Sequence, residues 1–495
     1  MSDKPSKSTL PPIAEIIKGM LFTAIILFFI SPDSYTHLPF GRGDSAWFFL
    51  SGKAWMNGMT PYVDFSDSKG PLLWLIYGIG YLISPRSYHG VFWISVLFYY
   101  VTFLFTYKTI KLFLTKKYWA MGATAIMPLA YFNPLLHYEI RAEDFCLTFM
   151  VISLFLLCKT LYGREIPDVQ ILSRRSFTMG ACFMAILLIK FNIAAMQAVL
   201  SLFLLIYSIR YIRFAREMVW MAMGAAVIAA PFIVYFAAVG NLKSFINEYF
   251  LLTFQTTDHW TDTSHFIFGY MSLNTLPVAI TVFVVTLSGV LMAVRYLSRW
   301  RYIPLIAFLI IFTLSLQNAT CTYYFCNVAP FLLFLVIGVV LFIDRQTRDT
   351  YKVRRIISVL RPVIILMILV LCVYANIEAT DKVGNIRWQD NSKKEEYKNI
   401  TSEMTKKKKP TIVYFSFLDA YDVPCDALPG CKYFARQDGE LPEMLEEARE
   451  ACRNGQPDFV MAKADDNDTH HFLLSCQYKP IKEGRHLGVR LYAKQ

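Results

Sequence analysis

The sequence predicts a polytopic α-helical membrane protein that carries a soluble α/β domain at its C-terminal end. Of the 495 residues, 55% are hydrophobic and only 17% are charged, whereas soluble domains are about one quarter charged. The apolar residues gather in runs of about 17–25 residues, which is the length of a helix that crosses a bilayer. This composition excludes a disordered chain, a collagen-like chain and a small disulfide scaffold.

Eleven apolar runs have the length and composition of membrane spans. They cover residues 13–31, 90–107, 118–136, 145–161, 177–192, 193–209, 218–239, 267–294, 302–316, 325–343 and 362–379. A twelfth run at 71–84 (PLLWLIYGIGYLIS) is shorter, and it is interpreted as a helix that lies in the outer interface of the membrane. Counting it as a span would disrupt the alternation of charge between successive loops.

The net charge of +12 is unevenly distributed. Nineteen basic residues lie in five short loops, whereas the alternate loops before residue 380 hold few. The positive-inside rule therefore puts the basic loops and the N-terminus in the cytoplasm, and residues 380–495 outside. In a bacterium, the spans would lie in the inner membrane and the C-terminal domain would lie in the periplasm. The clusters are interpreted as a topology signal, and no nucleic-acid partner is expected.

Residues 380–495 form a second unit, because the composition becomes polar after the membrane module at 1–379. Residues 380–410 read as a linker, and 411–495 read as an α/β domain large enough for a small core of its own. Within it, TIVYFSF (411–417), 458–464 and 486–494 are predicted strands, and 441–455 is a predicted helix that ends at Gly455.

Four cysteines lie in the C-terminal domain: Cys425, Cys431, Cys452 and Cys476. In an oxidising compartment they suggest up to two disulfides, with three alternative connectivities. The C-x-x-C spacing of a zinc site is absent from these residues, so no metal site is predicted here.

The first outer loop (32–89) is unusually rich in charge for a segment beside the membrane. It carries Asp44, Asp64, Asp67 and Lys69 among aromatic residues that favour short interfacial helices. Asp64, Asp67 and Lys69 fit either a solvated loop with Asp–Lys pairs or a site. Asp44 lies at the end of a span between two small residues, and it is interpreted as functional, since charge at that depth is costly.

A second polar cluster, HYEIRAEDF (137–145), separates the third and fourth spans. Glu143 and Asp144 stand at the start of a helix, where acids stabilise the helix dipole and cap its N-terminus, or else act in a site. Arg141 has no role in such a cap. It suits either a phosphate or the carboxylates of the first outer loop.

Three further polar residues lie at the outer ends of later spans. Lys190 either extends to the lipid headgroups or binds a lipid phosphate. Tyr323 and Tyr324 either belong to the aromatic belt of the interface or hold a phosphate oxygen through their hydroxyls. Nucleotide-binding, zinc-protease and serine-hydrolase motifs are absent from the sequence. An enzyme built on these residues would act on an activated substrate that itself lies in the membrane.

The motifs GRGDSAWF (41–48), GMTPYVDFSDSKGPL (58–72) and RAED (141–144), in this order after an N-terminal span, resemble the GT-C superfamily of integral-membrane glycosyltransferases. The similarity covers residues 13–343, and the branch it resembles includes protein O-mannosyltransferases and lipid A aminoarabinose transferases. It implies a polyprenyl-phosphate-linked sugar donor, undecaprenyl phosphate being the bacterial carrier, and an acceptor hydroxyl on an envelope glycan, lipid or protein.

The resemblance also implies roles for individual residues. Asp44 aligns with the family's first-loop Asp and would be the general base. Many relatives have an Asp-Glu pair here, whereas Ser45 follows Asp44, so the second acid would come from Asp64, Asp67, Glu143 or Asp144. The groups available to stabilise the leaving phosphate are Lys69, Arg141, Lys190, Tyr323 and Tyr324.

Inverting displacement is the simplest stereochemistry for such a transfer. The scheme requires no cofactor or metal, although a divalent cation could take part. Two functions of other classes compete with it: a transporter or flippase of lipid-linked sugars, and a non-catalytic envelope protein whose C-terminal domain does the work. Transporters place their charges near the bilayer midplane and contain repeated helices, features not found in this sequence.

Overall fold

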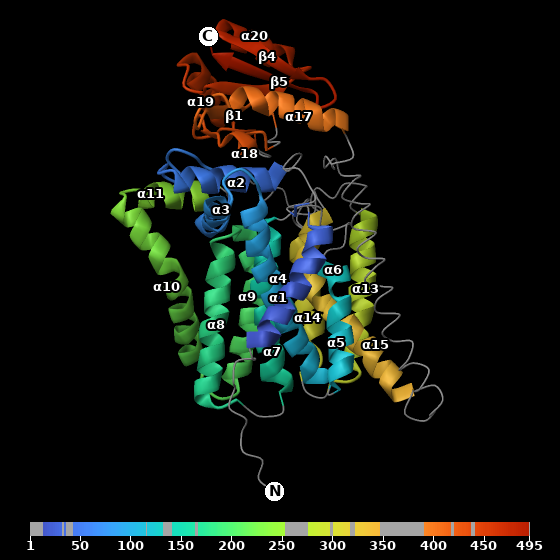
Figure 1. Ribbon diagram of the computed structural model, residues 1–495. Coiled ribbons are helices and arrows are strands. Elements are labelled where there is room, and N and C mark those ends of the chain that lie inside the picture. Colours follow the sequence, from blue (N-terminus) through green and yellow to red (C-terminus); the bar gives the residue numbers. More distant parts are fainter. Residues whose placement is uncertain are drawn as a thin grey trace.

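The chain folds into a bundle of long helices that is covered at one end by the C-terminal α/β domain (Figure 1). The computed structural model describes residues 13–31, 34–35, 43–114, 116–131, 141–163, 167–252, 276–297, 300–316, 322–346, 391–416, 420–436 and 441–494. We call the end of the bundle next to the C-terminal domain the capped end.

The bundle consists of apolar helices, as the sequence predicts. Its elements are α1 (Ile13–Ile30), α4 (His89–Phe113), α5 (Lys117–Ile126), α6 (Pro128–Tyr131), α7 (Ala142–Tyr162), α8 (Val169–Leu187), α9 (Phe191–Ile209), α10 (Phe214–Ala238), α11 (Leu242–Phe245), the π-helical turn η1 (Ile246–Leu251), α13 (Leu276–Val294), α14 (Ile303–Leu316), the 3₁₀ helix η4 (Thr322–Phe331) and α15 (Leu332–Gln346). Within the described ranges, six segments are long and apolar enough to cross a membrane. The chain is therefore a multi-pass membrane protein.

Several predicted spans have different bounds in the structure. The run 118–136 is not one helix as far as it is described, because α5 ends at Ile126 and α6 restarts at Pro128. Met127 itself keeps helical dihedral angles, but Pro128 has no backbone N–H and cannot continue the hydrogen-bond ladder of α5, which explains the break. The predicted span 362–379 and residues 267–275 lie outside the described residues, so the count of eleven spans stays a prediction.

Two short helices lie across the capped end. They are α2 (Gly43–Met56) and α3 (Pro71–Ile83), and both belong to the first outer loop (Figure 1). At 13 residues, α3 is too short to cross a bilayer, which agrees with the interfacial helix predicted at 71–84. The two helices pack closely at Gly52, where a Cβ would lie 2.5 Å from the backbone nitrogen of Gly78.

The connections between helices alternate between the two ends of the bundle. Arg141 begins α7 and Lys190 lies between α8 and α9, and both residues are at the capped end. The start of α8 and the end of α9 are therefore at the opposite end, and so are Arg174 and Arg213. Arg174 and Arg213, which belong to two of the basic loops, thus share one end of the bundle, as the charge pattern predicts for these two loops.

The C-terminal domain contains one mixed five-stranded sheet in the order β2-β1-β3-β5-β4. Its elements are α17 (Asn391–Met404), β1 (Thr411–Tyr414), α18 (Asp422–Cys425), β2 (Leu428–Pro429), α19 (Pro442–Arg453), β3 (Phe459–Lys463), α20 (Asn467–Ser475), β4 (Tyr478–Gly484) and β5 (Val489–Lys494). The strands β2, β1 and β3 are parallel, whereas β5 is antiparallel to both β3 and β4. The predicted helix and the three predicted strands are confirmed.

The predicted linker at 380–410 contains a helix, which corrects the prediction. In α17, Tyr397, Ile400, Thr401 and Met404 are buried, and their spacing places them on one face. The remaining positions are mostly charged or polar, so the mean composition reads as a linker. The sequence also missed β4, because its residues are mostly exposed and lack the alternation of buried and exposed positions that marks a strand.

The four cysteines of the C-terminal domain are free thiols in the structure, and the suggested disulfides are not formed. Cys425 is buried in α18, on the side of the domain that faces α2. Cys452 belongs to the core between the sheet and the helices on its other side, and Cys431 and Cys476 pack against that core. They therefore serve as small apolar core residues.

Candidate active site

The start of α7 gathers three charged residues that the sequence singles out. Arg141 is the N-cap residue, and its backbone N–H donates to Asp144 Oδ2 at 2.7 Å. Asp144 also accepts a hydrogen bond from the Tyr99 hydroxyl. Asp144 thus fits the capping alternative for these two acids, whereas Glu143 points to another partner.

Glu143 forms a buried ion pair with Lys190. The ammonium of Lys190 donates to Glu143 Oε1, and the two side chains are only 8% and 2% exposed, respectively. The other carboxylate oxygen, Oε2, is buried and has no hydrogen-bond partner among the residues that the structure describes. A buried acceptor without a donor costs free energy, and a ligand hydroxyl would satisfy it.

The loop between α8 and α9 fixes Lys190 and also anchors the first outer loop. The backbone N–H groups of Gly70 and Leu72 donate to Ile189 O and Leu188 O, both at 3.0 Å. A Cβ at position 70 would lie 2.0 Å from the Leu188 carbonyl oxygen, so only glycine allows this approach. The K-G-P motif therefore places Lys69 next to the loop that carries Lys190.

Two stacked tyrosines from η4 complete this group. The rings of Tyr323 and Tyr324 lie 4.6 Å apart, and both are partly exposed. The guanidinium of Arg141 is 3.8 Å from the centre of the Tyr323 ring, and the ammonium of Lys190 is 4.8 Å from that of Tyr324. These cation–π contacts hold the two basic side chains at the capped end.

Asp44 lies in the first turn of α2, where the helix dipole favours an acid, and it is partly exposed. Burial raises the pKa of its carboxyl, but the charges of Arg141, Lys69 and Lys190 lower it, and the net pKa is below the ordinary value of 3.8. Asp44 is therefore ionised beside three cations. We call Lys69, Arg141 and Lys190 the cation cluster.

Asp67 is also brought to this region. It is 6% exposed, its Oδ1 accepts from the Ser68 hydroxyl at 3.2 Å, and it lies 3.8 Å from the Lys69 ammonium. Asp64, in contrast, is exposed on a turn, where its Oδ2 accepts from the backbone N–H of Thr60 at 2.6 Å. Asp64 thus fits the alternative of a solvated loop acid, and its catalytic role remains a prediction that the geometry does not favour.

Sequence reasoning missed Glu248, which lies in η1. Its carboxylate binds Lys432 at 2.7 Å and Tyr433 at 3.0 Å in the C-terminal domain, and the Ser66 hydroxyl at 2.9 Å. This acid thus connects η1, the first outer loop and the C-terminal domain, and its partner Ser66 precedes Asp67 in the chain. The sequence carries no local signal for it, because a single acid beside an apolar segment is common.

Lys53 is a second residue whose role only the fold reveals. Its ammonium donates to Asp422 Oδ2 at 2.9 Å, and both side chains are fully buried. Asp422 begins α18, so this pair connects α2 with the C-terminal domain. The ring of Trp47 contacts Phe434 on the same interface, with 5.0 Å between their centres.

The described residues contain no group of three His, Cys, Asp or Glu side chains that could hold a metal ion. The acids of the site are instead distributed among different partners. Glu143 pairs with Lys190, Asp144 caps α7, and Asp44 faces the cation cluster.

The chain matches no family model and none of the curated proteins. Among solved structures it is similar to ArnT from Cupriavidus metallidurans bound to undecaprenyl phosphate, with a TM-score of 0.65, 13% identity, and coverage of 97% of this chain and 98% of that one. The apo state of the same protein gives a TM-score of 0.62 at the same identity and coverage.

A further similar structure is a mutant of arabinofuranosyltransferase AftD from Mycobacteria. Its TM-score is 0.53 at 14% identity, and the match covers 98% of this chain and 42% of that chain. At such identities the similarity establishes the fold. The chain shares the fold of ArnT over its bundle and its C-terminal domain together, which is the fold that the first-loop motifs lead us to expect.

Proposed function

We propose that this protein is a membrane glycosyltransferase that moves a sugar from a polyprenyl-phosphate-linked donor to an acceptor hydroxyl. The observation that carries the proposal is the ionised carboxylate of Asp44 facing three cations at the capped end. Glycosyl transfer from a lipid phosphate needs one group to take a proton and several to stabilise a leaving phosphate. The fold that the chain shares with ArnT, which is solved with undecaprenyl phosphate bound, supports the same donor class.

The proposed reaction is a single displacement. The acceptor hydroxyl oxygen forms a bond to the anomeric carbon of the sugar, and Asp44 takes the hydroxyl proton. The bond between that carbon and the phosphate oxygen breaks, and its electron pair stays on the phosphate. This route inverts the configuration at the anomeric carbon, and a positioned general base contributes about 10²–10⁴-fold to the rate.

The cation cluster stabilises the negative charge that develops on the phosphate. Arg141 offers a planar fork of donors, and Lys69 and Lys190 offer point charges. The hydroxyls of Tyr323 and Tyr324 can donate to phosphate oxygens as well. When the donor binds, its phosphate offsets the cations that depress the pKa of Asp44, so the carboxylate becomes a better base in the complex than in the free enzyme.

The placement of the charges favours an orientation in the membrane. The capped end holds the site and the C-terminal domain, and Arg174 and Arg213 of two basic loops lie at the other end. We therefore place the capped end in the periplasm and the N-terminus in the cytoplasm of a bacterial inner membrane. The sugar is a hexose or a pentose, its acceptor is an envelope glycan, lipid or protein, and turnover needs no metal ion.

The second candidate function is a transporter or flippase of lipid-linked sugars. The buried Glu143–Lys190 pair is the observation that favours it, since buried ion pairs mark many transport pathways. The pair nevertheless lies at the capped end of the bundle, whereas transporter sites lie near the bilayer midplane. A non-catalytic envelope protein would give the cation cluster no role.

The test is a turnover assay with the purified protein in nanodiscs. Undecaprenyl-phosphate sugars and a membrane extract that supplies acceptors are added, and free undecaprenyl phosphate is measured. The wild type is compared with Asp44→Asn and with the matched control Asp465→Asn, whose carboxylate is exposed in the C-terminal domain.

Release by the wild type and by Asp465→Asn, but not by Asp44→Asn, supports the transferase and its base. Equal release by all three proteins contradicts the role of Asp44. If no sugar gives release, reconstituted vesicles then decide for the flippase, since a flippase moves the lipid-linked sugar between leaflets without cleaving it.

A further inference from the structure

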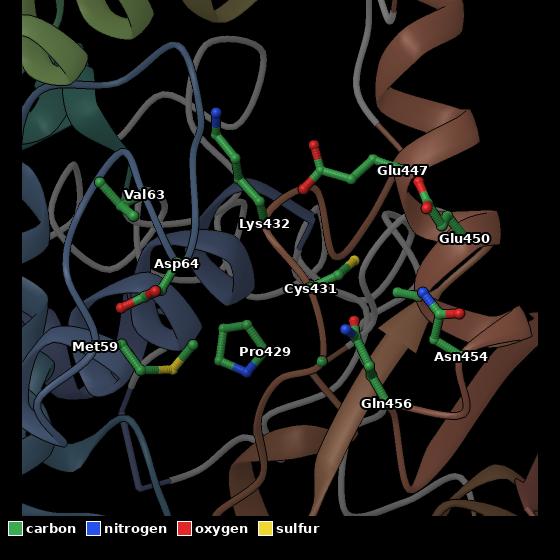
Figure 2. Close-up of a pocket in the computed structure, with 12 residues that line it drawn as sticks. Met59, Val63, Asp64, Pro429, Cys431, Lys432, Glu447, Glu450, Asn454 and Gln456 are labelled. Atoms are coloured by element: carbon green, nitrogen blue, oxygen red, sulfur yellow. The ribbon is translucent and has the colours of Figure 1, made fainter.

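A cavity of 510 Å³ lies between the first outer loop and the C-terminal domain (Figure 2). Cavities of about 300–1,000 Å³ typically hold small-molecule ligands. Its lining consists of Met59, Val63, Asp64, Pro429, Gly430, Cys431, Lys432, Glu447, Glu450, Ala451, Asn454 and Gln456. The lining therefore combines three residues of the first outer loop with nine of the C-terminal domain.

The polar side chains of this cavity offer free hydrogen-bonding capacity. Glu447, Glu450 and Asn454 come from α19, and Gln456 follows that helix. None of these four side chains has a hydrogen-bond partner in the described part of the chain. Amides both donate and accept and carboxylates accept, which is the combination that binds sugar hydroxyls.

The lining carries more negative than positive charge. Asp64, Glu447 and Glu450 are acids, and the one cation among the lining residues, Lys432, is paired with Glu248. Figure 2 shows Glu447 extending toward Lys432 from the opposite wall. Burial raises the pKa of Glu447, Glu248 and Glu450 raise it further, and Lys432 only partly offsets this. An anionic ligand would therefore be repelled.

The cavity is connected to the candidate active site through the first outer loop. The backbone N–H of Ser66 donates to Lys432 O at 3.0 Å, and the Ser66 hydroxyl donates to Glu248 at 2.9 Å. Asp67 and Lys69 follow in the same loop. A molecule held in the cavity thus lies beside the segment that carries part of the cation cluster.

We propose that this cavity binds the saccharide part of the acceptor, in the form of a hydroxyl-rich segment without acidic groups. This inference rests on the proposed function, because it names the acceptor of that transfer. The donor is held by the cation cluster at the membrane surface. The acceptor saccharide is held between Asp64 and α19, on the side of the loop away from the bundle.

The test measures saccharide binding by the full-length protein in nanodiscs. The probes are two neutral tetrasaccharides, N-acetylchitotetraose and maltotetraose, with tetragalacturonate as the acidic comparison. The cavity variant is Glu450→Ala with Asn454→Ala. Its matched control is Glu443→Ala with Asn399→Ala, which removes the same two side-chain types at exposed positions outside the lining. Asp44→Asn is included as a variant of the donor site.

At least one neutral probe is expected to bind the wild type, the control and Asp44→Asn with a dissociation constant below about 10 mM. The cavity variant is expected to bind the same probe at least about tenfold more weakly. Tetragalacturonate is expected not to bind. No binding of either neutral probe, equal binding by the cavity variant, or preference for the acidic probe would each overturn the proposal.

A turnover measurement separates this proposal from the proposed function. The cavity variant should still release undecaprenyl phosphate slowly to water at the wild-type rate, and should need at least about tenfold more membrane extract for half-maximal stimulation. An unchanged extract requirement contradicts the cavity as acceptor site and leaves the transferase intact. If the wild type releases no undecaprenyl phosphate, the transferase is contradicted, whatever the binding data show.

Discussion

The two halves of α2 use charge in opposite ways. Near its start, Asp44 is partly exposed, and the charges of Arg141, Lys69 and Lys190 lower the pKa of its carboxyl. Farther along, Lys53 is fully buried and its ammonium is satisfied by a single carboxylate, Asp422, at 2.9 Å. The two residues are nine positions apart on one helix, yet Asp44 is partly exposed beside the cation cluster, whereas Lys53 is fully buried in an interface.

This difference shows how to separate function from architecture in a membrane protein. A charge pair that is closed and fully buried stabilises one arrangement of domains, and removing one partner leaves a charge without compensation. A cluster of cationic side chains beside a surface opening is suited to an anionic ligand. The predictions below test whether the two halves of α2 separate activity from stability.

The largest effect is expected for Asp44→Asn. Loss of the general base should lower turnover by about 10²–10⁴-fold. The apparent unfolding temperature should change by less than about 2 °C, since the site contributes little packing. Turnover and thermal unfolding are measured on the same preparation. A large drop in unfolding temperature would mean that Asp44 is architectural, and the contrast within α2 would disappear.

Lys53→Met should have the opposite profile. It leaves Asp422 buried without its partner and should reduce the stability of the docked C-terminal domain by about 3–5 kcal/mol. Faster trypsin cleavage near the Lys406–Lys409 run and a lower unfolding temperature report this change. The double variant Lys53→Met with Asp422→Asn should recover much of the loss. If the single variant is as stable as the wild type, the buried pair does not hold the domain.

Arg141→Ala should weaken use of the donor. Losing a charged hydrogen bond to the phosphate should raise the KM for the donor by about 10–100-fold. Arg141→Lys keeps the charge but loses the planar stacking on Tyr323, so it should recover only part of the effect. Steady-state kinetics with varied donor separate the two variants. If both kcat and the KM for the donor are unchanged in Arg141→Ala, Arg141 lies outside the donor site.

The pH dependence gives a smaller and more specific effect. The folded pKa of Asp44 lies below 3.8, so the acid is ionised at neutral pH in the folded and unfolded states alike. Its stabilising contribution is present above pH 3.8 and is lost as the pH falls through the depressed folded pKa. We therefore expect kcat/KM to vary by less than about twofold between about pH 5 and pH 7.5 on account of this residue. A steep acidic limb in that range, absent in Asp44→Glu, would contradict the assignment.

The smallest effect is expected for metal removal. Incubation with EDTA and exchange into metal-free buffer should change turnover by less than about twofold, since three cationic side chains already stabilise the leaving phosphate. Restoration by Mg²⁺, Mn²⁺ or Zn²⁺ after a strong loss would show that a cation takes part, and the roles of Lys69 and Arg141 would need revision.

Much of the fold follows from local sequence. Apolar runs of sufficient length give helices such as α4, α7 and α9, and the short run at 71–84 gives the short helix α3. The break at Pro128 and the helix α17 were missed, because each depends on a detail that averaged hydrophobicity hides. In α17 the buried face consists of Tyr397, Ile400 and Met404 among charged neighbours.

The sequence by itself determined which residues we propose for the chemistry. Asp44, Lys69, Arg141, Lys190 and the two tyrosines were singled out because charged and hydroxyl groups are costly at the membrane boundary. The tertiary structure alone decided their partners: that Glu143 pairs with Lys190, that Asp144 caps α7, and that Lys53 and Glu248 bind the C-terminal domain. The physical reason is distance along the chain. Local patterns report the solvation of each residue, whereas a pair separated by 369 positions, such as Lys53 and Asp422, is set only by how the domains pack.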